Sequence, residues 1–322
     1  MTTSCPVSIL PIEILGHIFT FLPNCHQDFP KPNTKPPSWL AVTHVCRRWR
    51  FASLSYIDLW TNIITDPVGW TEESLRRSGS APIAIKIKLE PISSPIPNAI
   101  SQALSHYPRA GRIDLEGKGI WPLLACVPVK PAPFLYSVAL KERAPQFHLK
   151  HDLSFLHEDL PNLIGLLLDG IQLPWSSSGK IFKPTLVELS LSLGGVPPDH
   201  RPSDMEVREV LLSLPVLEHL FLAHAFREST DTAQTVSDIA ATPDYPYPRL
   251  SFPHLTHLTI ISDSAPALSF FACSLQIPKA KAMTVAYMPH TLSGNSINNV
   301  IPHSTHFLSL GVMHRGMRDA RT

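Results

Sequence analysis

Histidine and cysteine are the residue types in this chain whose spacing could support chemistry. His254 and His257 lie three residues apart, as do His148 and His151, and such a pair can supply two ligands of a metal ion. Neither pair comes with the further ligands that a metal site requires, and sixteen histidines make such pairs common by chance. Cys46 has apolar neighbours in a predicted helix, which favours an inert core thiol over a nucleophile. We therefore expect no metal, no cofactor and no catalytic residue.

Enzyme motifs and the marks of several binding classes are also missing from the sequence. It contains no G-x-x-x-x-G-K-[ST], G-x-G-x-x-G, HExxH or G-x-S-x-G motif. A net charge of +1 gives no argument for binding nucleic acid or an anionic membrane, and no run of eighteen apolar residues could span a bilayer. Five scattered cysteines without a CxxC pair suit a reducing compartment, so we expect the cytosol or the nucleus.

The segment 10–22, LPIEILGHIFTFL, has the features of a helix. Pro11 suits the first helical position, and Glu13 places a negative charge where the helix dipole favours it. The segment is apolar round most of its circumference, so it should be buried on most sides. A module of about fifty residues cannot bury that much of one helix alone. We therefore expect a second protein to cover part of it.

This segment, together with WLAVTHVCRRWRFAS at 39–53 and LW at 59–60, resembles an F-box. The resemblance implies a small helical unit, residues 8–60, that docks on the Skp adaptor of a cullin-RING ubiquitin ligase and reaches a cullin through it. The connection 23–38 is longer and richer in proline than is usual in that family. Apolar residues at helical spacing usually mean core, and singly Val45, Cys46 and Trp49 fit that alternative. The implied adaptor-binding residues are Leu10, Pro11, Ile14, Leu15, Ile18, Phe19, Leu22, Leu40, Val42, Val45 and Trp49.

A repeat marked by proline fills most of the remaining chain. Four segments, starting at 161, 184, 215 and 253, share the pattern Pro-x-Leu-x-x-Leu-x-(Leu/Ile). Looser copies start at 82, 108, 133 and 278, and a ninth at 303 lacks the proline. Each copy ends in alternation of period two, which predicts a strand whose fifth and seventh residues after the proline face inward. Helices are predicted between the strands at 97–107, 121–127, 153–160 and 203–214.

Strands and helices alternating at this period predict parallel strands in an α/β fold. The copies resemble leucine-rich repeats over 82–312, which implies a solenoid with a parallel sheet; a generic parallel α/β sheet is the alternative. The turn position that usually carries Asn in that family holds Ile171, Gly194, Ala225 and Asp263. Residues 61–81 are predicted to be a linker with a capping helix at 70–80, and 313–322 a tail.

The sheet face offers a surface for a protein target. The fourth, sixth and eighth residues after each proline should point to this face. There, His219, Phe221, His257 and Thr259 are the expected anchors, while Lys88 and Arg112 are expected to steer the partner's approach. Together with this surface, the resemblance to an F-box implies a substrate-recognition subunit of a ubiquitin ligase that performs no bond chemistry. An F-box scaffold acting outside ubiquitin transfer is the alternative, and an enzyme on the repeat scaffold is a third reading that the missing motifs disfavour.

Overall fold

The fold was analysed in a computed structural model, which describes residues 6–22, 38–65, 68–89, 96–144, 153–227, 250–263 and 275–287. The chain divides into two compact units. The first comprises Met1–Ser137 with Glu158–Leu160, and the second comprises Val138–His157 with Pro161–Thr322. The ninth repeat copy, the tail at 313–322 and the pair His148 and His151 lie outside the described residues.

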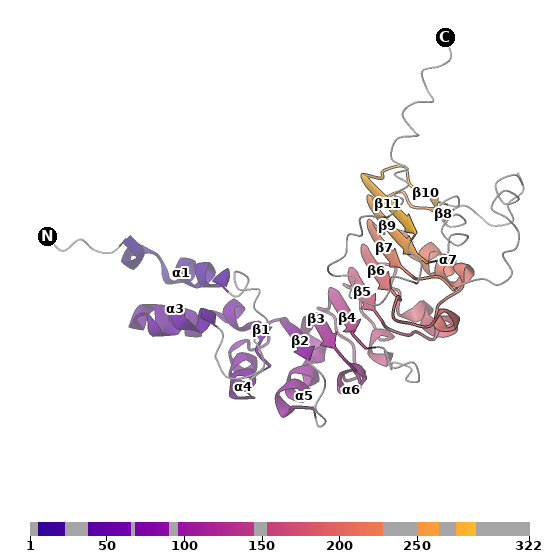
Figure 1. The fold of residues 1–322 in the computed structure, drawn as a ribbon. Helices are drawn as coiled ribbons and strands as arrows, with labels where there is room; N and C mark the ends of the chain where they lie inside the picture. Colours follow the sequence, from indigo (N-terminus) through magenta and orange to yellow (C-terminus); the bar gives the residue numbers. More distant parts are fainter. Residues whose placement is uncertain are drawn as a thin grey trace, which may run out of the picture. The chain divides into compact units, whose positions relative to one another are not determined.

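The first unit starts with helices and continues into parallel strands (Figure 1). Its longer helices are α1 (Ile12–Phe19), α3 (Arg47–Ser55), α4 (Val68–Arg77) and α5 (Asn98–Ser105), and a single turn, α6, spans Trp121–Leu124. Short 3-10 helices occupy Pro6–Ile9, Ser38–His44, Ile57–Trp60 and Tyr107–Arg109. The strands β1 (Asn62–Ile63), β2 (Ile83–Leu89) and β3 (Ala110–Gly117) pair in parallel, with β2 in the middle.

The second unit is dominated by parallel strands in chain order. Its sheet runs β4 (Ser137–Glu142), β5 (Gly165–Asp169), β6 (Glu188–Ser192), β7 (His219–Ala223), β9 (His257–Ser262) and β11 (Ala282–Tyr287). A separate parallel pair joins β8 (Leu250–Ser251) to β10 (Leu275–Gln276). Helix α7 (Asp204–Leu212) and 3-10 helices at Ser154–Leu156, Trp175–Lys180 and Pro198–His200 lie between strands in the sequence.

Proline sets the start of the strands, as the repeat predicted. In six copies the strand begins four residues after the proline, namely Pro133, Pro161, Pro184, Pro215, Pro253 and Pro278. The predicted inward positions are buried in four successive strands, none more than 2% exposed: Leu166 and Leu168, Leu189 and Leu191, Leu220 and Leu222, Leu258 and Ile260. The strand register inferred from the alternation is therefore confirmed for these strands.

The helix predictions hold at three places and fail at one. Helices α5, α6 and α7 lie within the predicted segments 97–107, 121–127 and 203–214, and Ser203 caps α7 in a capping box with Glu206. The prediction at 153–160 is wrong, because only Ser154–Leu156 forms a 3-10 helix there. This segment has no capping side chain at its start and is followed by Pro161, so it is too short to sustain an α-helix.

The predicted linker 61–81 contains the expected helix and one element more. Helix α4 ends at Arg77, and Gly79 follows with a φ of 53°, in the left-handed region that glycine tolerates. The addition is β1, whose residues Asn62 and Ile63 pair with Ala84 and Ile85 of β2. The parallel pairing therefore starts directly after the N-terminal helices, twenty residues before the first repeat proline.

A buried charged cluster links loops at the carboxyl ends of β7 and β9. Asp263 Oδ2 lies 2.6 Å from Arg201 Nη1 and 3.3 Å from His224 Nδ1, and the side chains are at most 8% exposed. His224 has a φ of 51°, and a Cβ on Gly194 would lie 3.2 Å from its ring, so glycine leaves room for it. Burial alone would raise the pKa of Asp263, but the contacts with His224 and Arg201 outweigh it and lower that pKa.

Candidate functional site

The N-terminal helices enclose an apolar core of their own. Leu15 and Phe19, one turn apart on α1, are each 2% exposed, and the ring of Phe19 packs on that of Trp49 with 5.0 Å between centroids. Residues Trp39, Leu40, Val42, Ala52, Leu59, Trp60 and Ile64 complete this core. One face of α1 is therefore used inside the module.

Gly16 and Arg48 hold α1 against the rest of the module. A Cβ on Gly16 would lie 2.5 Å from the ring of Tyr56, closer than side chains can approach, so only glycine fits there without displacing that ring. Arg48 of α3 donates a hydrogen bond to the backbone oxygen of Leu10, two residues before the start of α1. These contacts fix the orientation of α1, and with it the direction of its remaining faces.

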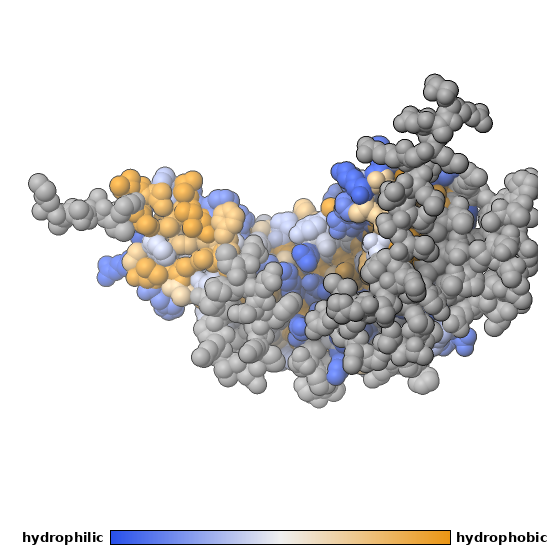
Figure 2. All heavy atoms as spheres, turned by 45° about the horizontal axis from the view of Figure 1, so that its top comes forward, coloured by the Kyte–Doolittle hydropathy of each residue, from blue (hydrophilic) through white to orange (hydrophobic). Residues whose placement is uncertain are grey.

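The neighbouring face of α1 is apolar but exposed. Ile14 and Ile18 are one turn apart and are 47% and 44% exposed, and Phe21 follows at 57%. Further large apolar side chains of the module point to solvent: Ile9, Val45, Phe51 and Ile57. Figure 2 shows apolar residues gathered over this module, where Figure 1 places α1 and α3. We call these seven residues the outer apolar surface; exposed apolar groups of this extent are typical of protein interaction sites.

The structure divides the predicted adaptor-binding residues into three groups. Pro11, Ile14, Ile18 and Val45 are exposed, and Leu10, Leu22 and Trp49 are half-buried. Leu15, Phe19, Leu40 and Val42 are buried in the module's own core, at 2% to 7% exposed. The second reading of the sequence, that part of this apolar set is intramodule packing, therefore holds for those four. It is wrong for Val45 and Cys46, which are exposed, so Cys46 is not the core thiol that the sequence predicted; Trp49 is half-buried.

Sequence reasoning missed four members of the outer apolar surface: Ile9, Phe21, Phe51 and Ile57. Phe21 lies within the apolar segment 10–22, so its apolar side chain could have been included among the predicted adaptor-binding residues. Phe51 follows a run of four cationic or aromatic residues on α3, and its 63% exposure depends on how α3 packs, which the spacing does not specify.

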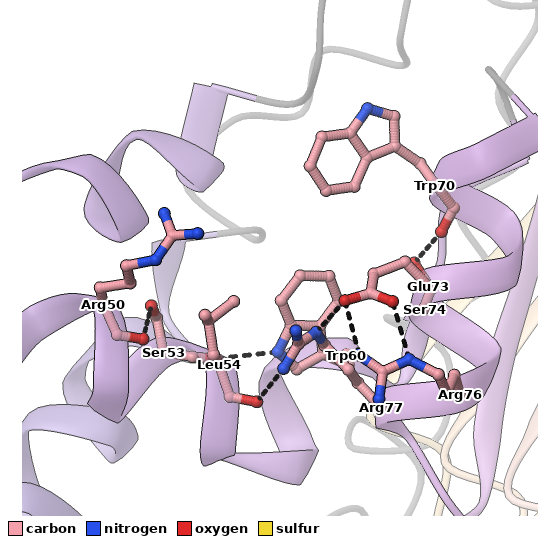
Figure 3. A network of polar contacts seen from close by, with 9 residues as sticks. All are labelled: Arg50, Ser53, Leu54, Trp60, Trp70, Glu73, Ser74, Arg76 and Arg77. Carbon is pink, nitrogen blue, oxygen red and sulfur yellow. Dashed lines mark hydrogen bonds and ion pairs between the residues drawn. The ribbon is translucent and has the colours of Figure 1, made fainter.

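A polar network ties α4 to the end of the N-terminal module (Figure 3). Glu73 receives hydrogen bonds of 2.8 Å from Arg76 and 2.5 Å from Arg77. Arg77 also donates to the backbone oxygen of Leu54 at 2.7 Å, and its guanidinium lies 5.0 Å from the ring centroid of Trp60. The hydrogen bond from Arg76 is the largest cause of the lowered pKa of Glu73, about 2; burial opposes this shift and Arg77 adds to it.

The second candidate surface lies on the sheet of the second unit. His219 and His257 are paired in register on β7 and β9, and their rings stack with 4.6 Å between centroids and 7° between planes. Phe221 pairs with Thr259 two residues further along the same strands, so the four predicted anchors are neighbours on one face. Phe221 and His219 are half-buried, and His257 is exposed. Phe221 is therefore less exposed than the sequence suggested.

The predicted steering residues are paired with acidic neighbours in the first unit. Lys88 Nζ lies 3.5 Å from Glu116 Oε1, and Arg112 Nη2 lies 3.6 Å from Asp114 Oδ2. Both pairs are at least partly open to solvent, where such interactions are weak and screened by salt. Their effect on a partner's approach stays a prediction.

The described parts of the chain contain neither a metal-binding cluster nor a membrane-spanning helix. Among those residues, no group of three or more His, Cys, Asp or Glu side chains is arranged to hold a metal ion. Nor does any helix within the described ranges have the length and apolarity needed to cross a membrane.

Comparison with known proteins identifies the N-terminal module. Residues 7–66 match the model of the F-box-like family, which covers α1, α3 and β1 and ends before α4. F-box domains in general bind Skp-type adaptors. No curated protein matches the chain.

Proposed function

We propose that this chain is the substrate-recognition subunit of a cullin-RING ubiquitin ligase of the SCF type. In this proposal the F-box-like region binds a Skp-type adaptor, and through it a cullin, while the strand-rich region binds a protein target. The chain itself performs no bond chemistry, and it acts in the cytosol or the nucleus. The family match at residues 7–66 supports the adaptor part of the proposal.

One observation carries the adaptor part: α1 is apolar on two sides and uses only one of them internally. Leu15 and Phe19 fill the module's core, whereas Ile14, Ile18 and Phe21 remain exposed. Covering exposed apolar side chains with a partner favours binding, by about 25 cal/mol for each Å² of apolar surface removed from water. A helical partner surface of matching apolar character would supply that cover.

The target-binding part rests on the repeat. We infer that residues 82–312 are irregular leucine-rich-like repeats, because six strands begin four residues after a proline and the aligned inward positions are buried in four successive strands. In such an array equivalent positions of successive repeats form rows across the sheet. The row containing His219 and His257 and the row containing Phe221 and Thr259 are the proposed target contacts.

The proposed contribution to catalysis is proximity. A target held on the chain stays near the ubiquitin-conjugating enzyme, which raises its effective concentration there. Within the first unit, the contacts of Arg77 with Leu54 and Trp60 join α4 to the F-box-like region by side-chain contacts as well as by the backbone.

Reconstitution tests the proposal in two steps. The full chain mixed with a Skp-type adaptor, a cullin and its RING subunit should elute as one complex. Proximity labelling in cells with the full chain and with a chain lacking residues 1–60 should then give a target that the purified complex ubiquitinates. An eluted complex that transfers no ubiquitin to any captured target would favour the alternative, an F-box scaffold outside ubiquitin transfer. Failure to bind the adaptor would refute both.

A further inference from the structure

Three neighbouring residues in one row of the second unit's sheet form a stack of two rings that ends beside a small side chain. His219 on β7 pairs in register with His257 on β9, and His257 pairs with Ala282 on β11. The first two rings are stacked 4.6 Å apart. Because β9 lies between β7 and β11, one face of the His257 ring is covered by His219 and the other faces the side on which β11 runs.

The free face of His257 is sterically accessible among the described residues. His257 and Ala282 are both exposed, and so is Thr284, the next residue of β11 on the same face. The methyl group of Ala282 leaves room above it that a larger side chain would fill. Neighbouring strands lie about 4.8 Å apart, close to the spacing of the two rings. A third planar group above Ala282 would therefore continue the stack at the same spacing.

Hydrogen bonding restricts the orientation of the His257 ring. Its Nδ1 lies 2.8 Å from Thr256 Oγ1, and that hydroxyl is 3.2 Å from the backbone oxygen of Glu218, directly before β7. The His257 ring is thus held by the hydrogen bond with Thr256 at its Nδ1 edge and by the ring of His219 on one face. A ring held in this way loses little rotational freedom when a ligand stacks on it.

We propose that the free face of His257 above Ala282 is a stacking slot for an aromatic side chain of a protein target, next to an acidic residue of that target. This inference rests on the proposed target-binding function of the same sheet face. An aromatic ring fits because offset-stacked and near-parallel rings attract beyond the area they bury. The acidic neighbour follows from the exposed Lys281 directly before Ala282 and from the exposed Lys279. The two lysines would also repel an arginine side chain, so an aromatic ring is favoured over a guanidinium group even though both are planar.

Fluorine NMR with two dipeptide probes tests the slot on the full chain. The probes are N-acetyl-fluorotryptophanyl-glutamate amide and the same compound with lysine in place of glutamate. The glutamate probe should bind more tightly than the lysine probe. Ala282→Leu fills the slot, and both Ala282→Leu and His257→Ala should weaken binding roughly tenfold, the size expected from one aromatic pair. His257→Phe should retain binding, since it keeps a ring in place.

Two further variants separate the slot from non-specific effects. Ala280→Leu makes the same substitution at an exposed position outside the row and should leave binding unchanged. Lys281→Glu should reverse the preference between the two probes, which a purely structural role would not do. Equal probe binding by the wild-type and Ala282→Leu chains would overturn the inference. Adaptor binding, measured on the same samples, reports on the proposed function separately, so a chain that binds the adaptor but not the probes refutes only the slot.

Discussion

Replacing Ile14 and Ile18 together with alanine should weaken adaptor binding while leaving the fold intact. The two side chains stand one turn apart on α1 and are 47% and 44% exposed, so they lie at the edge of the core and not in it. Leu15 is the contrasting position on the same helix at 2% exposed. The double variant should change affinity, whereas Leu15→Ala should change stability.

The magnitudes follow from the exposed fractions. Fully burying an isoleucine side chain is worth about 1.5–3 kcal/mol, and nearly half of each side chain remains for a partner to cover. The pair should therefore contribute about 2 kcal/mol to binding, which corresponds to a roughly thirtyfold increase in Kd on truncation. Truncating Leu15 to alanine should instead lower the free energy of unfolding by about 2–5 kcal/mol, since the cavity is internal.

Calorimetric titration of the full chain with a purified Skp-type adaptor measures the affinity, and thermal unfolding of the free chain measures the stability. Ile164→Ala is the matched control, because Ile164 is 46% exposed but lies in the second unit. The reasoning is refuted if the double variant binds the adaptor as tightly as the wild type, or if Ile164→Ala weakens binding by as much.

The remaining predictions concern stability. Leu189→Asp should lower the unfolding temperature far more than Glu188→Ala, because Leu189 is 2% exposed and a buried carboxylate costs more than about 3 kcal/mol; similar unfolding temperatures would mean that the strand register is wrong. Asp263→Ala should cost about 3–5 kcal/mol, measured by denaturant unfolding, because it leaves Arg201 buried without its counter-charge; an unchanged unfolding midpoint would contradict this. Glu73 has a pKa of about 2 against an ordinary 4.5, so its contribution to stability is full above about pH 4.5 and is lost as the pH falls toward 2. Unfolding temperatures of Glu73→Gln should accordingly fall less than those of the wild type between pH 4.5 and 2.

The strand positions could be predicted because they depend on short-range patterns. Proline before the strand and alternation within it are local properties, and burial on one face forces the register, as Leu220 and Leu222 illustrate. Helix α7 could be predicted equally well, since Ser203 and Glu206, three residues apart, form its capping box. By contrast, β1 is two residues long and depends on β2 as a partner, so no local pattern indicates it.

The candidate binding surfaces could be predicted only in part from the sequence. The apolar content of the segment 10–22 indicated that something must cover it, but not which side chains face inward. Leu15 and Ile14 are adjacent and of similar hydrophobicity, yet one is 2% and the other 47% exposed. The difference arises from the packing of α1 on α3, which Gly16 permits by leaving space for Tyr56.

The sequence by itself indicated most of the strands, three of the helices between them, the buried face of four successive strands, and the F-box-like character of the first sixty residues, because periodicity and residue type act over a few positions. Tertiary structure alone decided which residues meet across strands and loops. The stack of His219 on His257, thirty-eight residues apart, and the burial of Asp263 against Arg201, sixty-two residues apart, are examples. The repeat places His219 and His257 at equivalent positions, but the stacking of their rings and the contact of Asp263 with Arg201 depend on how the parallel strands and their loops pack.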